Sequence, residues 1–131
     1  SGAVLTAACI RAGYVRQVAA FVGRWLHEEA QRMLAPCVAD FAARITKRAF
    51  TFKLSNARSE WGSCNEHGMI RLNWRLIQLP PHLARYVVAH EVAHLVELNH
   101  SKRSWGLVEA LFPGHAEARG TLDDWTALLE A

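Results

Sequence analysis

The sequence predicts a single α+β domain, in which a small antiparallel sheet or hairpin packs against one buried helix and further helices surround it. Three observations support this fold class. The 131 residues are enough for one hydrophobic core and too few for two. Residues 49–55 and 69–74 alternate apolar with polar or smaller side chains, which is the period of a strand. Residues 82–98 are apolar at nearly every position, which is typical of a helix buried on all sides.

The first helix is predicted from Tyr14 to Leu34, because apolar side chains recur at helical spacing and arginines such as Arg16 and Arg24 occupy the other side. Residues 36–45 then form a second short helix, or they continue the first helix past a kink at Pro36. The apolar side of the first helix consists of Val15, Val18, Phe21, Val22, Trp25, Leu26 and Met33.

Turn and capping residues divide the rest of the chain. Residues 65–68 predict a tight connection into the second strand. Pro81 suits the first turn of the buried helix, and Ser101 suits the N-cap of a helix that continues through Leu111. Residues 115–129 are expected to form the last helix.

Composition excludes several classes of protein. No apolar run reaches the roughly 18 to 20 residues that a transmembrane helix needs, so no membrane partner is expected. Cys9, Cys37 and Cys64 are an odd, scattered set without a C-x-x-C pair, which argues against a disulfide framework or a zinc finger. They favour a reducing compartment, and we expect a cytoplasmic protein. No base can be assigned to Cys64, so we interpret it as structural.

Basic residues concentrate between residues 41 and 59, where no acidic residue occurs until position 60. This stretch is either a solvated face or a surface that attracts phosphate or acidic substrates. Aromatic residues do not interleave with the bases as in a single-strand-binding protein, yet a nucleic acid or nucleotide partner stays open. The basic residues are Arg44, Lys47, Arg48, Lys53 and Arg58.

The segment HEVAHLVELNH, residues 90–100, carries the chemistry. Histidines four apart on a helix lie on one face about 6 Å apart along the axis, so His90 and His94 can converge on one metal ion. Glu91 is rotated about 100° from His90, so its carboxylate can reach a metal-bound water instead of the metal. This H-E-x-x-H pattern is typical of two zinc ligands and a general base.

A catalytic zinc usually takes three protein ligands, and His100 is the candidate for the third. An unbroken helix would carry His100 about 9 Å beyond His94 along the axis. We therefore expect the helix to end near Leu98, with Asn99 in the left-handed conformation that ends many helices, so that His100 folds back toward the ion.

The remaining histidines sit near turns or on polar faces and are expected to be ordinary surface residues. They are His27, His67, His82 and His115. The side chain of Glu97 or Glu109 could orient a metal ligand, and the spacing does not choose between them.

The segments EWGSC, GMIRLNWRLIQLPPHLARYVVAHEVAHLVELNHS and the later SW together resemble the YgjP-like family of small zinc metallopeptidase domains, which is related to the SprT and WLM types of minimal zincin. The resemblance extends from about Trp25 to Leu122. It implies a zincin-like fold with His90, His94 and His100 as zinc ligands and Glu91 as the catalytic acid and base. It also implies that the hairpin at residues 61–64 packs beside the site.

Family members usually begin with a β-rich segment before the first long helix, so we expect residues 1–131 to be one domain truncated at that segment. Ser104 stands where the family usually has an aromatic residue, which implies looser packing under the metal.

The expected function is hydrolysis of peptide bonds by one Zn2+ per chain, through attack of zinc-bound water assisted by Glu91. The alternative is a metal-dependent pyrophosphatase that cleaves nucleotide phosphoanhydrides, and a less favoured reading is a non-enzymatic binding module with a structural zinc. The substrate identity and the oligomeric state are not predicted. The candidate substrate-side residues are Arg58, Trp61, Ser63, Arg71 and Arg75.

Overall fold

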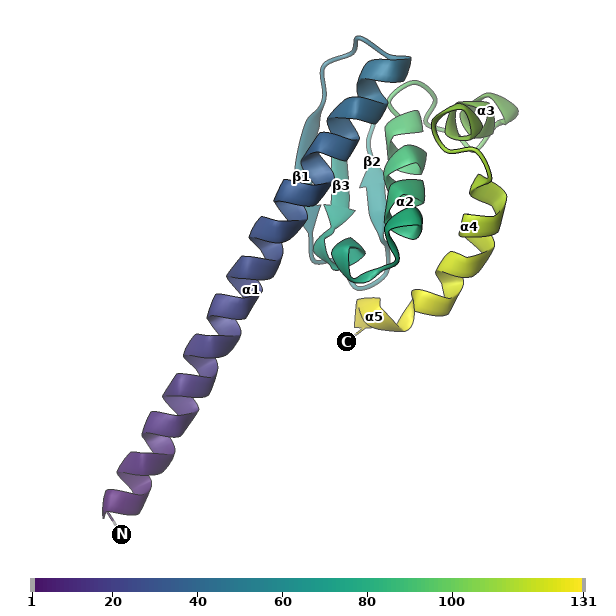
Figure 1. The fold of residues 1–131 in the computed structure, drawn as a ribbon. Coiled ribbons are helices and arrows are strands. Elements are labelled where there is room, and N and C mark those ends of the chain that lie inside the picture. Colours follow the sequence, from purple (N-terminus) through teal and green to yellow (C-terminus); the bar gives the residue numbers. More distant parts are fainter. Residues whose placement is uncertain (1, 131) are drawn as a thin grey trace.

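The computed structural model describes the backbone of residues 2–130 and the side chains of residues 10–130. It confirms the α+β class (Figure 1). In chain order the elements are α1 (Gly2–Ile45), β1 (Thr51–Ser55), β2 (Gly62–Cys64), β3 (Met69–Asn73), the 3₁₀ helix η1 (Trp74–Gln78), α2 (Pro81–Ala93), α3 (Lys102–Leu111), α4 (His115–Leu122), the 3₁₀ helix η2 (Asp123–Trp125) and α5 (Ala127–Glu130).

The sheet has three strands in the order β1-β3-β2, with β3 in the centre. Both predicted strands are present, but β1 and β3 run parallel and not antiparallel as expected. The hairpin is instead formed by β2 and β3, which the tight turn at residues 65–68 joins. Gly68 has a φ of 77° in this turn, a conformation that glycine adopts without strain. Three residues are too few to show an alternation, so the pattern did not reveal β2.

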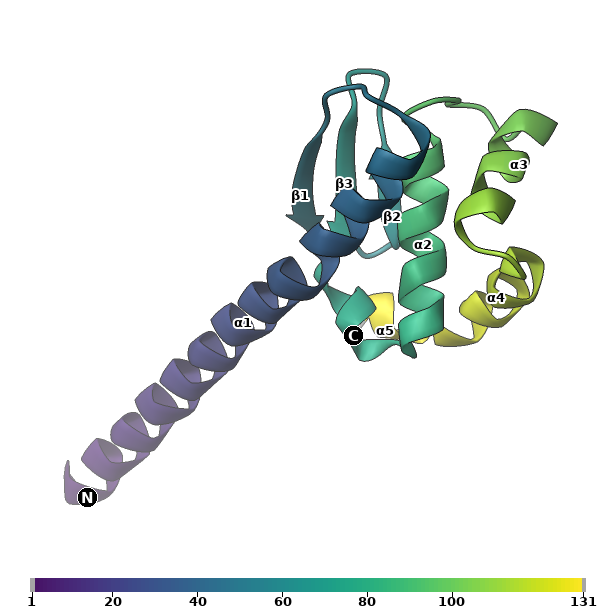
Figure 2. The same ribbon diagram turned by 45° about the horizontal axis from the view of Figure 1, so that its top comes forward.

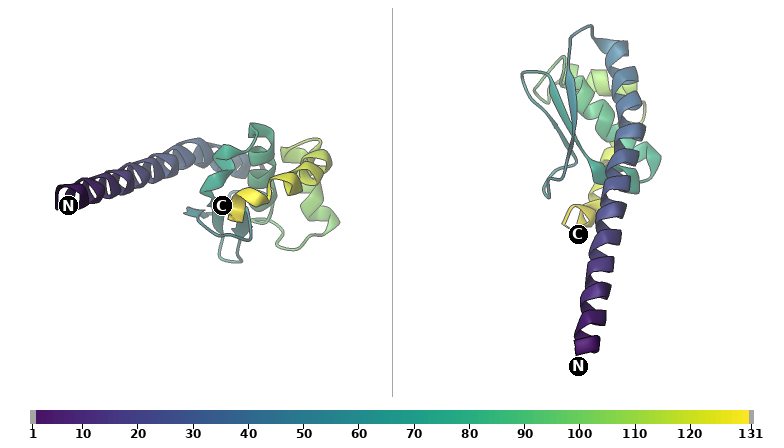
Figure 3. Two further views of the ribbon diagram at one scale, coloured as in Figure 1. Left: turned by 90° about the horizontal axis from the view of Figure 1, so that it is seen from below. Right: turned by 90° about the vertical axis from the view of Figure 1, so that its left-hand side faces the viewer.

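Helix α1 is continuous through Pro36, which settles the alternative between one helix and two. Pro36 removes one backbone donor on an exposed side, where water can satisfy the carbonyl that is left unpaired. Only the second half of α1 packs on the sheet and α2, through buried residues that include Leu34, Val38 and Phe41. The first half projects away from the rest of the protein (Figure 3).

The apolar stripe predicted on the first half of α1 is therefore exposed and not packed. Phe21 is 63% exposed and Trp25 is 51% exposed. The helical spacing correctly predicted a helix here. Such spacing shows that a helix has an apolar side, but it does not show that another element covers that side. In the part of the chain whose side chains are described, no element covers this stripe.

Helix α2 is the central buried helix that the sequence predicts. It lies between α1 on one side and α3 and α4 on the other (Figure 2). Val88 and Val92 are fully buried in the same cluster as Ile70 and Leu72 of β3. Pro81 occupies its first turn, as expected. The helix contains no uninterrupted apolar stretch long enough for a bilayer, and none of the described helices qualifies as a membrane span.

The prediction that the central helix extends to Leu98 is wrong, because α2 ends at Ala93. The next backbone amides bond three residues back, from Leu95 to Val92 and from Val96 to Ala93, which tightens the last turn and ends the helix. No non-glycine residue of the described chain has a positive φ, so Asn99 is not left-handed. Its side chain instead accepts a hydrogen bond from the Ser101 amide at 3.1 Å.

The C-terminal helices follow the expectation in part. Ser101 caps α3, accepting a hydrogen bond from the Ser104 amide, and α3 ends at Leu111 as predicted. The single helix expected over residues 115–129 is divided into α4, η2 and α5.

Candidate metal centre

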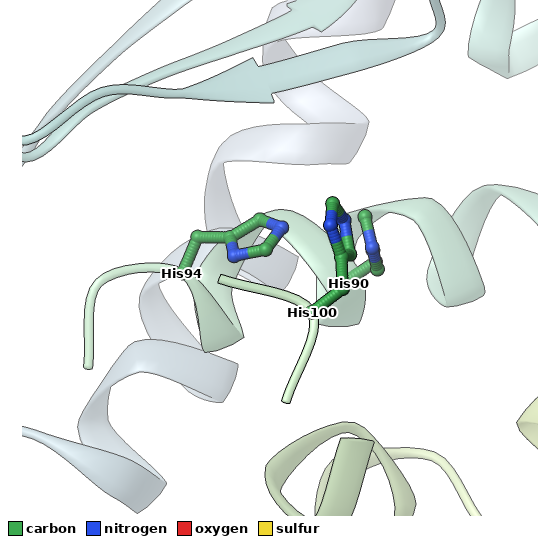
Figure 4. A group of neighbouring side chains, drawn as sticks. All are labelled: His90, His94 and His100. Atoms are coloured by element: carbon green, nitrogen blue, oxygen red, sulfur yellow. The ribbon is translucent and has the colours of Figure 1, made fainter. Parts of the chain in front are cut away.

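Three histidines meet beside the C-terminal end of α2 (Figure 4). His90 and His94 lie one turn apart on this helix, with ring centroids 4.7 Å apart. The turn that ends α2 brings His100 back, so that its ring lies 5.3 Å from His90 and 5.0 Å from His94. One ligand nitrogen from each side chain lies within 4.8 Å of the others. The helix break that the sequence predicts therefore has the expected consequence, although it falls five residues earlier.

These donors fit a metal ion. Imidazole nitrogens are preferred ligands of zinc, and a set of three leaves one coordination position for water or substrate. His94 Nδ1 lies 2.9 Å from the backbone carbonyl oxygen of Glu97. A carbonyl only accepts, so Nδ1 carries the proton and the lone pair of Nε2 is left for a metal. Glu97 thus orients His94 through its backbone, whereas the sequence had suggested its carboxylate.

Glu91 is buried next to the histidines, at 5% exposure. Its Oε2 lies 3.2 Å from His90 Nδ1. Strand β2 covers the carboxylate with a glycine: a Cβ on Gly62 would come within 2.8 Å of Glu91 Cγ. The expected packing of the 61–64 hairpin beside this cluster is therefore present, and Gly62 leaves room for the Glu91 side chain.

The indole of Trp105 packs against the histidines from α3. Its ring centroid lies 5.5 Å from His90 and 6.0 Å from His100. His115 of α4 stacks on the same indole at 5.5 Å and 13°, and its Nδ1 lies 2.6 Å from a carboxylate oxygen of Glu109. The prediction that His115 is an ordinary surface residue is therefore wrong, and Glu109 orients His115 and not a member of the metal cluster.

The other three histidines outside the cluster are exposed, as the sequence predicts. They are His27, His67 and His82.

The cluster favours neutral imidazole at His100. Burial lowers the pKa of His100. The positive charges of His94, His90 and Arg119 lower it further, and the Glu91 carboxylate has the opposite effect. A neutral imidazole is the form that binds metal.

Cys64 does not fit a nucleophile. Burial, with a smaller contribution from the Glu91 carboxylate, raises the pKa of its thiol to about 11. The thiol is therefore protonated at neutral pH, which supports the structural interpretation. Cys37 and Cys64 are both unpaired, and the side chain of Cys9 lies outside the described residues.

The candidate substrate-side residues do not form one surface around the histidines. Trp61 is buried. Ser63 and Arg71 pair across β2 and β3 and point to the opposite face of the sheet from Gly62, because side chains alternate along a strand. Arg75 is buried and donates to Asn56 Oδ1 at 2.8 Å.

Two residues of the basic stretch are likewise engaged in structural bonds. Arg48 donates to the carbonyl oxygen of Leu95 at 2.9 Å and to that of Glu66, and so ties the end of α1 to the turn after α2 and to the β2–β3 turn. Arg58 donates to the carbonyl oxygen of Glu130. Sequence analysis missed these roles because no local pattern indicates which distant carbonyl an arginine reaches.

Ser104 is almost fully buried, and its hydroxyl has no hydrogen-bond partner among the described residues.

The fold and the three-histidine cluster define an α+β domain that could hold a metal ion. The family model described as "YgjP-like, metallopeptidase domain" matches residues 12–124. The chain therefore belongs to the YgjP-like family, as the sequence motifs predicted.

Among solved structures, the fold is similar to that in the crystal structure of the metallopeptidase zymogen of Pyrococcus abyssi abylysin. The TM-score is 0.55 at 24% sequence identity, and the match covers 82% of this chain and 94% of the other. No curated protein matches the sequence.

Proposed function

We propose that this protein is a zinc-dependent peptidase that holds one Zn2+ per chain through His90, His94 and His100 and uses Glu91 as its general base. The observation that carries the proposal is the meeting of three imidazole nitrogens within 4.8 Å, directly beside a buried carboxylate. A buried carboxylate without a cation is costly, and a metal among the histidines supplies that cation.

Bound zinc would supply Lewis acidity, which makes water a nucleophile near neutral pH and polarises a carbonyl. Within that site Glu91 would accept a proton from the attacking water and return it to the leaving amine. The backbone carbonyl of Glu97 holds the His94 ring in one orientation. Gly62 keeps β2 close over Glu91, which excludes solvent from one side of the carboxylate.

The exposed backbone groups at the edge of β2 favour a peptide as the substrate. The Trp61 carbonyl accepts from the Asn73 amide, and the Asn65 amide donates to Met69. Bonded residues alternate along an antiparallel pair, so the backbone groups of Gly62 and Cys64 face the outer edge. Strand β2 pairs with β3 alone among the described strands, so an extended peptide can add to this edge next to Glu91.

The alternatives have less support. A pyrophosphatase needs cations that converge on phosphates, yet Arg48, Arg58 and Arg75 bond to the protein itself. A structural zinc usually has four protein ligands, and the cluster found among the described residues has three. We also place the protein in the cytoplasm, which the unpaired Cys37 and Cys64 support.

Three variants test the proposal. Glu91→Gln should retain one zinc per chain but lose peptide hydrolysis, and His94→Ala should lose both. Glu97→Gln is the control, because it changes a carboxylate near the cluster but keeps the backbone carbonyl that orients His94. Zinc content by mass spectrometry and peptide turnover are measured on each. Normal turnover by Glu91→Gln, or full zinc binding by His94→Ala, contradicts the assigned roles.

A further inference from the structure

Arg119 presents an unused positive charge near the histidine cluster. It lies on α4 and is exposed, and its guanidinium carbon lies over the Trp105 ring at 4.6 Å from the centroid. The same indole contacts His90 and His100, at 5.5 and 6.0 Å between ring centroids. One indole therefore links the guanidinium to two of the three histidines.

No anion of the described chain pairs with this charge. Arg32 pairs with Glu29 and Arg44 pairs with Asp40, each at the spacing of one helical turn. Asp123 lies four residues after Arg119, the spacing of Asp40 and Arg44, but it does not form an ion pair with Arg119 within 4.0 Å.

The position of Arg119 over the indole leaves its guanidinium exposed to a ligand. A guanidinium carries five N–H donors, which lie in its own plane. In this plane they match the two oxygens of a carboxylate. The indole also limits the conformations of a long side chain, which lowers the entropy lost when the ligand is bound.

We propose that Arg119 selects substrates by binding a carboxylate that lies within about three residues of the scissile bond. This carboxylate is either the C-terminal group of a peptide or the side chain of Asp or Glu. The inference rests on the proposed peptidase function. The guanidinium carbon lies 4.6 Å from the Trp105 centroid, and this centroid lies 6.0 Å from the His100 ring. An extended peptide advances about 3.3 Å per residue, so about three residues cover the two distances together.

The test compares zinc-loaded wild type with Arg119→Met, which keeps an apolar stem on Trp105, and with Arg119→Glu, which reverses the charge. Arg103→Met is the matched control, because Arg103 is also exposed and its Nη1 lies 3.9 Å from Glu97. A randomised peptide library is supplied in two forms, with a free or an amidated C-terminus, and the cleavage sites are read by mass spectrometry. Binding of both forms to zinc-loaded Glu91→Gln, with and without Arg119→Met, gives a readout independent of turnover.

We expect wild type to favour a carboxylate at one fixed position by about tenfold or more, as for other charge-assisted contacts. Arg119→Met should lose this preference in both cleavage and binding, Arg119→Glu should favour Lys or Arg there, and Arg103→Met should behave as wild type. A preference that amidation abolishes identifies the C-terminal carboxylate, and one that survives amidation identifies a side chain.

Three results would overturn the inference. Peptide cleavage by wild type with no carboxylate preference, or a preference that Arg119→Glu leaves unchanged, removes the role of Arg119 while the peptidase function stands. Absence of peptide cleavage and of peptide binding together removes both the function and the inference.

Discussion

Substitution of Gly62 by alanine should displace the Glu91 side chain and leave zinc binding unchanged. A Cβ at residue 62 would lie 2.8 Å from Glu91 Cγ, whereas ordinary carbon contacts begin at about 3.5 Å. Glu91 Cγ therefore has to move by roughly 0.7 Å or more, and the carboxylate that it carries is displaced with it. The new methyl group is also crowded from β3, where Leu72 Cδ2 and the Arg71 carbonyl oxygen lie 3.1 and 3.2 Å from the same Cβ.

A displacement of this size near the reacting groups costs up to about 100-fold in rate, so we expect kcat/KM of Gly62→Ala to fall by about 10- to 100-fold. Overpacking should also lower the free energy of unfolding by about 1–3 kcal/mol. Zinc content should stay at the wild-type value, because the three atoms nearest to the new methyl group belong to Glu91, Leu72 and Arg71 and not to a histidine.

The matched control is Gly23→Ala, where a Cβ meets nothing within 4 Å and the helical backbone suits alanine. It should keep wild-type activity and gain slightly in stability. Peptide turnover, zinc content and urea denaturation are compared for both variants. Unchanged kcat/KM in Gly62→Ala would refute the idea that this close approach positions Glu91.

Three further substitutions test other parts of the account. Arg48→Ala should lower the free energy of unfolding by about 1.5–3 kcal/mol in urea denaturation, because the charged donor to the Leu95 and Glu66 carbonyls is lost. Lys47→Ala should change it by less than about 0.5 kcal/mol, and equal effects would contradict the bridging role. Cys64→Ala should keep turnover. In folded wild type the Cys64 thiol should react slowly with iodoacetamide below about pH 11, because it stays protonated there. Rapid alkylation of Cys64 at neutral pH with loss of turnover would indicate that it is a nucleophile. Ser104→Ala should stabilise the fold by about 1 kcal/mol, because its buried hydroxyl lacks a partner; a loss of stability would indicate an undetected hydrogen bond.

The sequence predicted the elements whose pattern is local. The central helix, the two longer strands and the cap at Ser101 each depend on neighbouring residues, and the structure contains all of them. The histidine cluster was also predictable, since the helical period places His90 and His94 together and His100 can join them only if the helix ends.

What the sequence did not predict depends on contacts between distant segments. Strand β2 is too short for a period, and the parallel pairing of β1 with β3 follows only once β2 is placed at the edge. The closeness of Gly62 to Glu91 has no signal in the sequence other than a glycine at the start of a short strand. His115 was misread because its neighbour Trp105 lies on another helix. The exposed stripe around Phe21 shows that amphipathicity alone does not identify a packed face.

The most direct test of the central claim is a competition assay on zinc-loaded protein, with zinc-loaded Glu91→Gln as the blank. Both receive one mixture of unfolded peptides and nucleoside triphosphates, and mass spectrometry follows every component. We predict that wild type cleaves peptides, that the blank does not, and that the triphosphates stay intact in both. Pyrophosphate release by wild type with uncleaved peptides, or equal peptide cleavage in wild type and blank, would contradict a peptidase that acts through Glu91 and the three histidines.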